Sequence, residues 1–221
     1  MEASVKTKKK KITRDDIIKE YMNYVLEHEK TPVSIYKICK AIRIEESDFY
    51  AHFGSVETIQ KAIWSVLFDK AMEVINKSPE YESFGKKEKL LTFYYTLFEM
   101  LTLNRSYVLF SLTNHEYLLS GLAQLSGMRH KFQQYISQLN DFSEAAKLGV
   151  KRLASRTVEE GAWTQFLIIL RFWMKDDSPG FEKTDVMIEK SINTTFELAQ
   201  INPVRSIIDL GKFLIKERVG R

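Results

Sequence analysis

Apolar residues recur through most of the chain at the three- and four-residue spacing of an α-helix. The first run follows Thr13, a residue type that favours the N-terminal cap of a helix, with Asp15 and Asp16 in the first turn. Thr31-Pro32 is expected to end this helix. The apolar positions form one stripe along it: Ile17, Ile18, Tyr21, Met22, Val25 and Leu26.

Two shorter apolar patterns follow, and a tight turn separates them. Ser34 is the expected cap of a second helix, which turns Ile35, Ile38 and Cys39 inward. The turn at residues 42–44 leads to a third helix around residues 46–52, which Gly54 ends. A long fourth helix is expected from Ser55, with apolar positions at Ile59, Ile63, Val66, Leu67 and Val74.

The chain beyond Ser78-Pro79 is rich in aromatic residues, and its periodicity predicts further helices. Asp176 and Asp177 are expected to end the longest of them, because Pro179 prevents its continuation and Phe181 returns to the core. Only 9 Gly and 4 Pro occur in 221 residues, too few turn residues for a β-rich fold, so the predicted fold class is all-α. The expected helices cover residues 85–103, 105–118, 121–139, 142–174, 183–200 and 204–218.

These patterns divide the chain into four parts. Residues 1–12 form a basic tail without periodicity and are expected to be disordered, since residues 1–14 carry a net charge of +5. The tail is either solvated or an arm that follows DNA phosphates, and both interpretations stay open. Residues 13–54 form a three-helix helix-turn-helix domain, residues 55–78 a connecting helix, and residues 79–221 a larger helical domain.

Composition argues against several classes of protein. The lone Cys39 can form no intrachain disulfide, no apolar segment of a signal peptide follows the first lysines, and no apolar run approaches the length of a membrane span. We therefore expect a cytoplasmic protein without a membrane span. The four His are scattered, and neither a Gly-rich phosphate loop nor a GxSxG motif occurs, so no enzyme, metal site or cofactor is expected.

A sequence motif surrounds the third helix. Residues 40–59 read KAIRIEESDFYAHFGSVETI, with the core FYxxFxSxE at residues 49–57. This segment resembles the signature of the TetR family of transcriptional regulators. Thr13-Arg14 followed by Ile17 is similar to the usual opening of the first helix in that family.

The resemblance implies that double-stranded DNA is a partner and that the third helix lies in its major groove. Phe49 and Phe53 are expected to hold this helix against the first two, while Tyr50 and His52 face outward, within reach of phosphates. The candidate DNA-binding residues are Thr13, Arg14, Ser34, Tyr36, Lys37, Arg43, Glu46, Ser47, Asp48, Tyr50, Ala51 and His52.

The segment departs from the family pattern in two ways. Arg43 stands where the family usually has Gly, so the tight turn is expected to be strained. Glu45, Glu46 and Asp48 put three carboxylates on or beside the third helix, and residues 43–57 have a net charge of −3, which is unfavourable beside a polyanion. A carboxylate can also accept a hydrogen bond from cytosine, so a base-reading role stays open.

The family pairs this module with a helical domain that dimerises and encloses a ligand. The resemblance therefore implies a homodimer, with an interface that includes Phe166–Trp173 or Lys183–Ala199, and an apolar small molecule or lipid as ligand. Each aromatic residue could equally be ordinary core. The candidate pocket residues are Phe93, Leu97, Phe98, Leu101, Tyr107, Phe110, Trp163, Phe166, Leu170 and Trp173.

A shorter segment carries a second resemblance. Residues 172–184, FWMKDDSPGFEKT, are similar to a stretch of the TetR-like lipid-binding proteins of ubiquinone biosynthesis. The sequence thus predicts a TetR-like DNA-binding transcriptional regulator, acting as a ligand-responsive repressor. The alternative is a lipid- or isoprenoid-binding protein that keeps the TetR fold and has lost operator binding.

Overall fold

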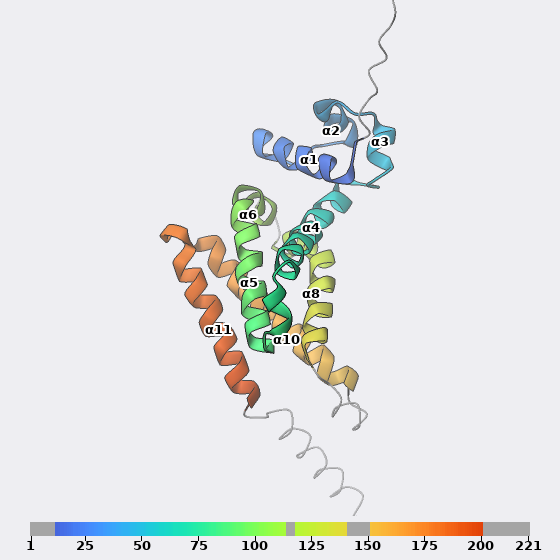
Figure 1. Cartoon of the computed structure of the whole chain (residues 1–221). Coiled ribbons are helices and arrows are strands. Elements are labelled where there is room, and N and C mark those ends of the chain that lie inside the picture. The colour runs from blue at the N-terminus through green and yellow to red at the C-terminus, as the bar shows by residue number, and fades with distance from the viewer. Residues whose placement is uncertain (1–11, 114–117, 141–150, 201–221) are drawn as a thin grey trace, which may run out of the picture. The chain divides into compact units, whose positions relative to one another are not determined.

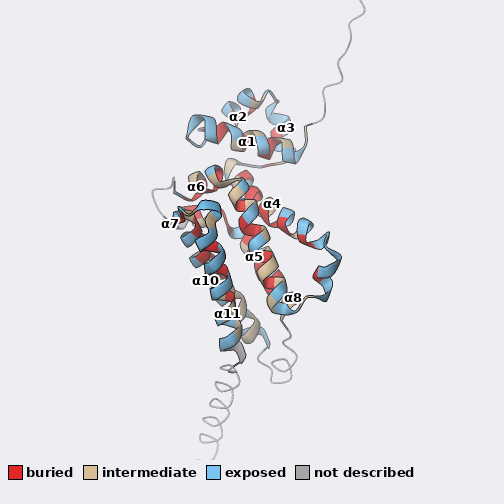
Figure 2. Ribbon diagram, turned by 60° about the vertical axis from the view of Figure 1, so that its left-hand side comes forward, coloured by how far each residue is buried: buried red, intermediate tan, exposed pale blue. Residues whose placement is uncertain are grey.

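The computed structural model describes residues 12–113, 118–140 and 151–200 (Figure 1). These residues form helices joined by turns, and no strand occurs among them, which confirms the all-α prediction. Figure 2 shows buried and exposed positions alternating along the helices, as expected when each helix buries one face. The chain forms two compact units, and each is described separately below.

The first unit comprises the chain up to Val66 together with Asn104–Gly127. Its interior is formed by α1, α2 and α3, with Ile17, Tyr21, Ile38 and Phe49 fully buried. The unit contains α1 (Arg14–His28), α2 (Ile35–Ile42), α3 (Glu46–Tyr50), the start of α4 (Val56–Asn76), α6 (Arg105–Thr113) and α7 (Leu118–Ala123).

Helix α6 packs against α1 inside this first unit. The ring of Tyr107 meets the ring of Tyr21 edge to face, with 6.4 Å between the centroids. Gln60 Nε2 donates a hydrogen bond of 3.0 Å to the Tyr21 hydroxyl. Burial raises the pKa of Tyr21 to about 12 despite this hydrogen bond, so Tyr21 stays protonated at neutral pH. The first helix is thereby tied to α6 and to the start of α4.

The second unit comprises Leu67–Leu103 and the chain from Met128 onward. Helix α11 packs along α5 and α10, as Figure 1 shows for α11 and α5. Trp173 Nε1 donates a hydrogen bond of 3.1 Å to Thr102 Oγ1 and so joins α10 to α5. The unit contains the end of α4, a 3-10 turn at Pro79–Ser83, α5 (Lys86–Leu103), α8 (Ser126–Leu139), α10 (Lys151–Lys175), a second 3-10 turn at Pro179–Phe181 and α11 (Glu182–Gln200).

Several helix boundaries differ from the sequence expectation. The segment expected as one helix over 121–139 is two helices, α7 and α8, broken at Gln124-Leu125. Gln124 Nε2 donates a hydrogen bond of 3.0 Å to the carbonyl of Ser111, and Leu125 is fully buried, so contacts distant in the sequence stabilise the break. Helix α6 is described over Arg105–Thr113, and residues 114–117 of the helix expected over 105–118 lie outside the described residues. The basic tail through Lys11 and the expected helix at 204–218 lie outside the described residues.

The first-helix stripe is also shifted from the expected one. Tyr24 is buried, whereas Leu26 is 40% exposed and Met22 is half-buried. The third helix ends at Tyr50, two residues earlier than expected.

Candidate functional site

Helix α3 is held in the first unit by two aromatic side chains one turn apart. Phe49 is fully buried and Phe53 nearly so, with 5.9 Å between their ring centroids. The guanidinium of Arg14 lies 5.2 Å from the centroid of the Phe53 ring, which links the start of α1 to the end of the α3 segment. Tyr50, between the two phenylalanines in sequence, is 52% exposed, as the sequence predicted.

The N-terminal ends of α1 and α2 are capped as expected. Thr13 and Asp16 form a capping box, in which Thr13 Oγ1 accepts from the Asp16 N–H at 3.1 Å and Asp16 accepts from the Thr13 N–H at 2.9 Å. Ser34 Oγ accepts from the Lys37 N–H at 3.3 Å. No acidic residue lies in the first turn of α2, and Tyr36 and Lys37 are exposed there. This helix end therefore offers a positive dipole and a lysine to an anion.

Arg43, where a strained turn was expected, adopts a left-handed conformation. It is the C-cap of α2, with φ 58° and ψ 45°. A non-glycine residue with this φ is strained, since its Cβ crowds the following carbonyl. The chain changes direction at Arg43, between the end of α2 and the start of α3.

The three carboxylates beside α3 do not have the same surroundings. Asp48 Oδ2 accepts a hydrogen bond of 3.3 Å from the Glu45 N–H and so caps the helix. Glu46 is exposed at the first position of α3. Burial, and then the charge of Glu46, raise the pKa of the inward-facing Cys39 thiol. Asp48, and Glu45 through the same capping box, therefore contribute to the start of α3, whereas Glu46 is exposed beside them.

All twelve candidate DNA-binding residues lie in the first unit, on α1, α2, α3 or the adjoining turns. Eleven are exposed, and His52 is half-buried rather than on the exposed side. Their accessibility is compatible with contact to a large partner, and their individual roles stay predictions.

Eight of the ten candidate pocket residues gather in the second unit. Phe93 of α5 and Phe166 of α10 are among them, and both rings meet that of Phe132 in α8. Phe98 of α5 meets Phe166 at 6.1 Å. The other two, Tyr107 and Phe110, belong to α6 in the first unit, where Tyr107 packs on α1.

Tyr94 lies inside this aromatic cluster and was not among the residues predicted to line a pocket. It is fully buried, and its ring is 6.2 Å from that of Phe98. The signal in the sequence was its position on the buried stripe of α5, which puts a hydroxyl on an otherwise apolar face. The buried residues of α5 are Leu90, Phe93, Tyr94, Leu97, Phe98 and Leu101.

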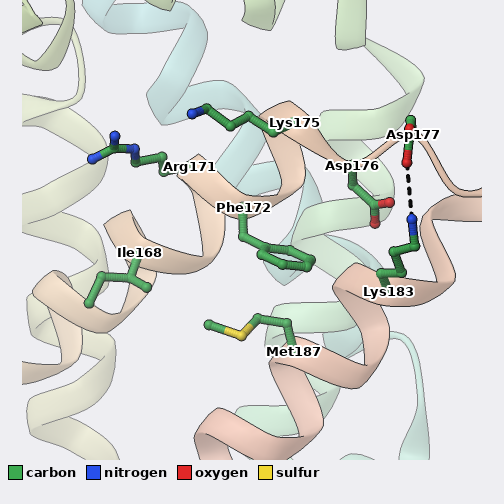
Figure 3. A pocket seen from close by; sticks show the side chains of 8 residues that line it. All are labelled: Ile168, Arg171, Phe172, Lys175, Asp176, Asp177, Lys183 and Met187. Atoms are coloured by element: carbon green, nitrogen blue, oxygen red, sulfur yellow. Dashed lines mark hydrogen bonds and ion pairs between the residues drawn. The ribbon is translucent and has the colours of Figure 1, made fainter.

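A surface groove of about 470 Å³ lies between α10 and α11. Figure 3 shows Phe172 of α10 facing Met187 of α11, with Asp177 and Lys183 paired at one end at 3.0 Å. Ile168 is 54% and Phe172 38% exposed, so the wall of the groove is an accessible apolar surface. Its full lining is Ile168, Arg171, Phe172, Lys175, Asp176, Asp177, Lys183 and Met187.

The turn after α10 is organised by Asp176. Its carboxylate accepts hydrogen bonds from the hydroxyls of Ser178 and Thr184, both at 2.6 Å, and from their backbone N–H groups, both at 2.9 Å. Burial alone would raise the pKa of Asp176, but these hydrogen bonds hold it well below its ordinary value. Helix α10 ends at Lys175, as predicted, and the half-buried Phe181 packs against Trp173 at 6.2 Å.

Within residues 12–113, 118–140 and 151–200, no three potential ligands cluster to hold a metal ion. None of the helices described has the length and apolar character needed to cross a bilayer.

Comparison with known proteins identifies the larger part of the chain. No characterised relative matches it. Residues 89–214, more than half of the chain, match the family of tetracyclin repressor-like C-terminal domains. The chain therefore belongs to the TetR family of regulators.

Proposed function

We propose that this protein is a DNA-binding transcriptional regulator, a homodimer whose operator affinity responds to a small apolar ligand. The observation that carries the proposal is the exposed face of the helix-turn-helix. Phe49 and Phe53 hold α3 in place from inside, while Tyr50 and the start of α2 are open to solvent. An α-helix held in this way fits the major groove of DNA.

The exposed residues have distinct roles in this proposal. Lys37 and the capped N-terminus of α2 meet a phosphate, and the Tyr50 hydroxyl meets another. Glu46 reads a base, since a carboxylate accepts from the exocyclic amine of cytosine. Asp48 supports the helix by its cap rather than by contacting DNA.

The packing of α6 on α1 suggests how a ligand controls the reading head. Helix α5, which carries much of the aromatic cluster, ends at Leu103, and α6 begins at Arg105. Helix α6 thus follows α5 in the chain, and its Tyr107 packs against Tyr21 of α1 inside the first unit. The ligand would act by favouring one of two conformers, with the reading heads spaced differently in each.

Selection of bound sites from random duplex DNA, with the purified full-length chain, tests the proposal. A selective duplex should emerge at physiological salt. Tyr50→Phe should then weaken binding to all duplexes by roughly fivefold to tenfold, the loss of one hydrogen bond. Glu46→Ala should instead change the preferred sequence at one position. Enrichment of no sequence would reject the regulator.

The basic tail contributes to affinity in the same proposal, although residues 1–11 lie outside the described residues. If its lysines follow phosphates, deletion of residues 1–12 should weaken binding to all duplexes equally and reduce the slope of log affinity against log salt. An unchanged slope would mean that the tail is only solvated.

A second candidate function is a lipid carrier that keeps the fold without operator binding. The observation in its favour is the charge of the helix-turn-helix itself: residues 12–54 have six Lys and Arg against eight Asp and Glu, a net charge of −2. Such a surface is repelled by phosphates. A lipid recovered by organic extraction of the purified protein, together with the absence of a selective duplex, would favour the carrier.

A further inference from the structure

The Tyr94 hydroxyl is an unusual group in the interior of the second unit. The residue is fully buried, and none of the described residues is placed to hydrogen bond with its Oη atom. Aromatic rings surround it, those of Phe93, Phe98, Phe132 and Phe166, with centroids 5.9 to 6.4 Å from its own. A phenylalanine would fill the same space without leaving a polar group unpaired, which makes the hydroxyl costly in this conformer.

The other buried tyrosines of the unit have hydrogen-bond partners for their hydroxyl groups. The hydroxyls of Tyr81 and Tyr135 bond to each other at 2.8 Å, and Tyr135 also donates to the Lys89 carbonyl at 3.0 Å. The neighbouring Tyr95 directs its side chain outward and is 38% exposed. Tyr94 thus differs from Tyr81 and Tyr135, because its hydroxyl is buried without a hydrogen-bond partner among the described residues.

The surroundings of Tyr94 limit what that partner can be. Among the described residues of the second unit, only Asp176 and Thr184 are buried polar or charged residues, and they bond to each other. The charge of Asp176 is already compensated by four hydrogen bonds, so the desolvation of an ionised ligand beside Tyr94 would be uncompensated. Burial raises the pKa of Tyr94 far above its ordinary value, so the phenol keeps its proton and acts as a donor at neutral pH.

We propose that the Tyr94 hydroxyl is the polar anchor for the ligand of this regulator, donating a hydrogen bond to an acceptor oxygen or nitrogen of an uncharged, largely apolar molecule. The inference rests on the proposed function and adds the chemical class of the ligand. It also supplies a reason for a population shift. The conformer described leaves the hydroxyl unpaired, whereas a ligand-bound conformer pairs it, so the ligand stabilises the second conformer over the first.

Two naphthalene probes of similar size test the chemistry on the full-length protein. Prodan is neutral and bears a ketone acceptor, and its emission moves to longer wavelength when the ketone accepts a hydrogen bond. Anilinonaphthalene sulfonate is apolar but carries a permanent negative charge. The wild type should bind prodan at least tenfold more tightly than the sulfonate.

The matched variants are Tyr94→Phe and Tyr95→Phe, adjacent on α5. Tyr94→Phe should weaken prodan binding by about tenfold, the loss of one buried hydrogen bond. It should also shift the emission of bound prodan to shorter wavelength, while the thermal midpoint of the free protein stays equal or rises. Tyr95→Phe should leave affinity and emission unchanged.

Three results would overturn the inference: no binding of prodan, prodan emission and affinity unaffected by Tyr94→Phe, or tighter binding of the sulfonate. Selective DNA binding is measured separately on the same protein samples. A protein that binds a selective duplex but fails the probe test would refute the role of Tyr94 alone. A protein that passes the probe test without a selective duplex would refute the regulator and leave the ligand site standing.

Discussion

At the scale of single residues, two positions combine a local cost with a clear structural purpose. Arg43 takes a left-handed conformation that glycine adopts without strain, and the chain turns there from α2 into α3. Asp176 is a buried carboxylate whose charge is compensated by four donors from Ser178 and Thr184. Both residues fix the direction of the chain after a helix, so both contribute to stability in ways that a substitution can measure.

Arg43→Gly should stabilise the protein by about 1 kcal/mol, because it removes the left-handed strain. The free energy of unfolding from urea titration is the measurement. Lys40→Gly in the last turn of α2 is the control, where the added backbone freedom should destabilise by up to about 1 kcal/mol. A destabilised Arg43→Gly would mean that the arginine side chain makes contacts that outweigh the strain.

Asp176→Asn should lower the thermal midpoint at neutral pH, because the amide puts a donor where the carboxylate accepts four hydrogen bonds. The pKa of Asp176 is below its ordinary value of 3.8, so its stabilisation is complete above that pH and is lost as the pH falls toward the lower folded value.

The difference in stability between wild type and Asp176→Asn should therefore narrow below about pH 4. Asp177→Asn serves as the control, since the Asp177–Lys183 pair is strongly exposed and contributes little. If the difference in stability between wild type and Asp176→Asn stays constant down to pH 3, the ionised Asp176 carboxylate does not stabilise the fold.

At the scale of helices, the sequence predicted those helix ends that depend on residues close to them in the chain. Caps at Thr13 and Ser34 and the stop before Asp176 follow from side chains within one turn of the helix end, and all three are confirmed. The break between α7 and α8 could not be predicted in this way, because its hydrogen bond joins Gln124 to Ser111. The cap at the start of α3, in which the Asp48 carboxylate accepts from the Glu45 N–H, was not predicted from the sequence. Asp48 had been interpreted only as a candidate DNA contact.

Substitutions at the adjacent residues Phe49 and Tyr50 test which face of α3 packs against the interior of the first unit. Phe49→Ala should destabilise the protein by about 3–5 kcal/mol, because a fully buried ring is removed. Tyr50→Ala should change the free energy of unfolding by less than about 0.5 kcal/mol, as expected for an exposed side chain. Both are measured by denaturant titration, and a reversed order would mean that α3 is rotated from its described orientation.

At the scale of the whole molecule, segments distant in the sequence form each of the two units. Residues 104–127 join the helix-turn-helix unit although they follow α5, and no periodicity indicated this. Hydrophobic periodicity reports which face of a helix is buried but not which helix covers it. The eight pocket candidates of the second unit lie on buried faces, as periodicity indicated, and their role in a pocket stays a prediction. Tyr107 was grouped with them only by composition, and it packs in the first unit.

The last prediction is that the chain forms a homodimer through the outer faces of α10 and α11. The groove there presents Ile168 and Phe172 to solvent, and Val186 and Leu198 of α11 are 47% and 56% exposed. A second copy that covers these side chains by two-fold symmetry would bury an apolar surface that is otherwise in water. Two half-sites on DNA require the same symmetry.

Phe172→Glu should convert the dimer to a monomer in sedimentation velocity at micromolar concentration, because the dimer interface would then bury an unpaired charge. Leu103→Glu is the control: Leu103 is 72% exposed at the end of α5 and lies outside the groove, so this variant should remain dimeric. Equal thermal midpoints of the two variants would exclude unfolding as the cause. A wild type that sediments as a monomer with and without duplex DNA would reject the dimer, and a dimeric Phe172→Glu would move the interface away from this face.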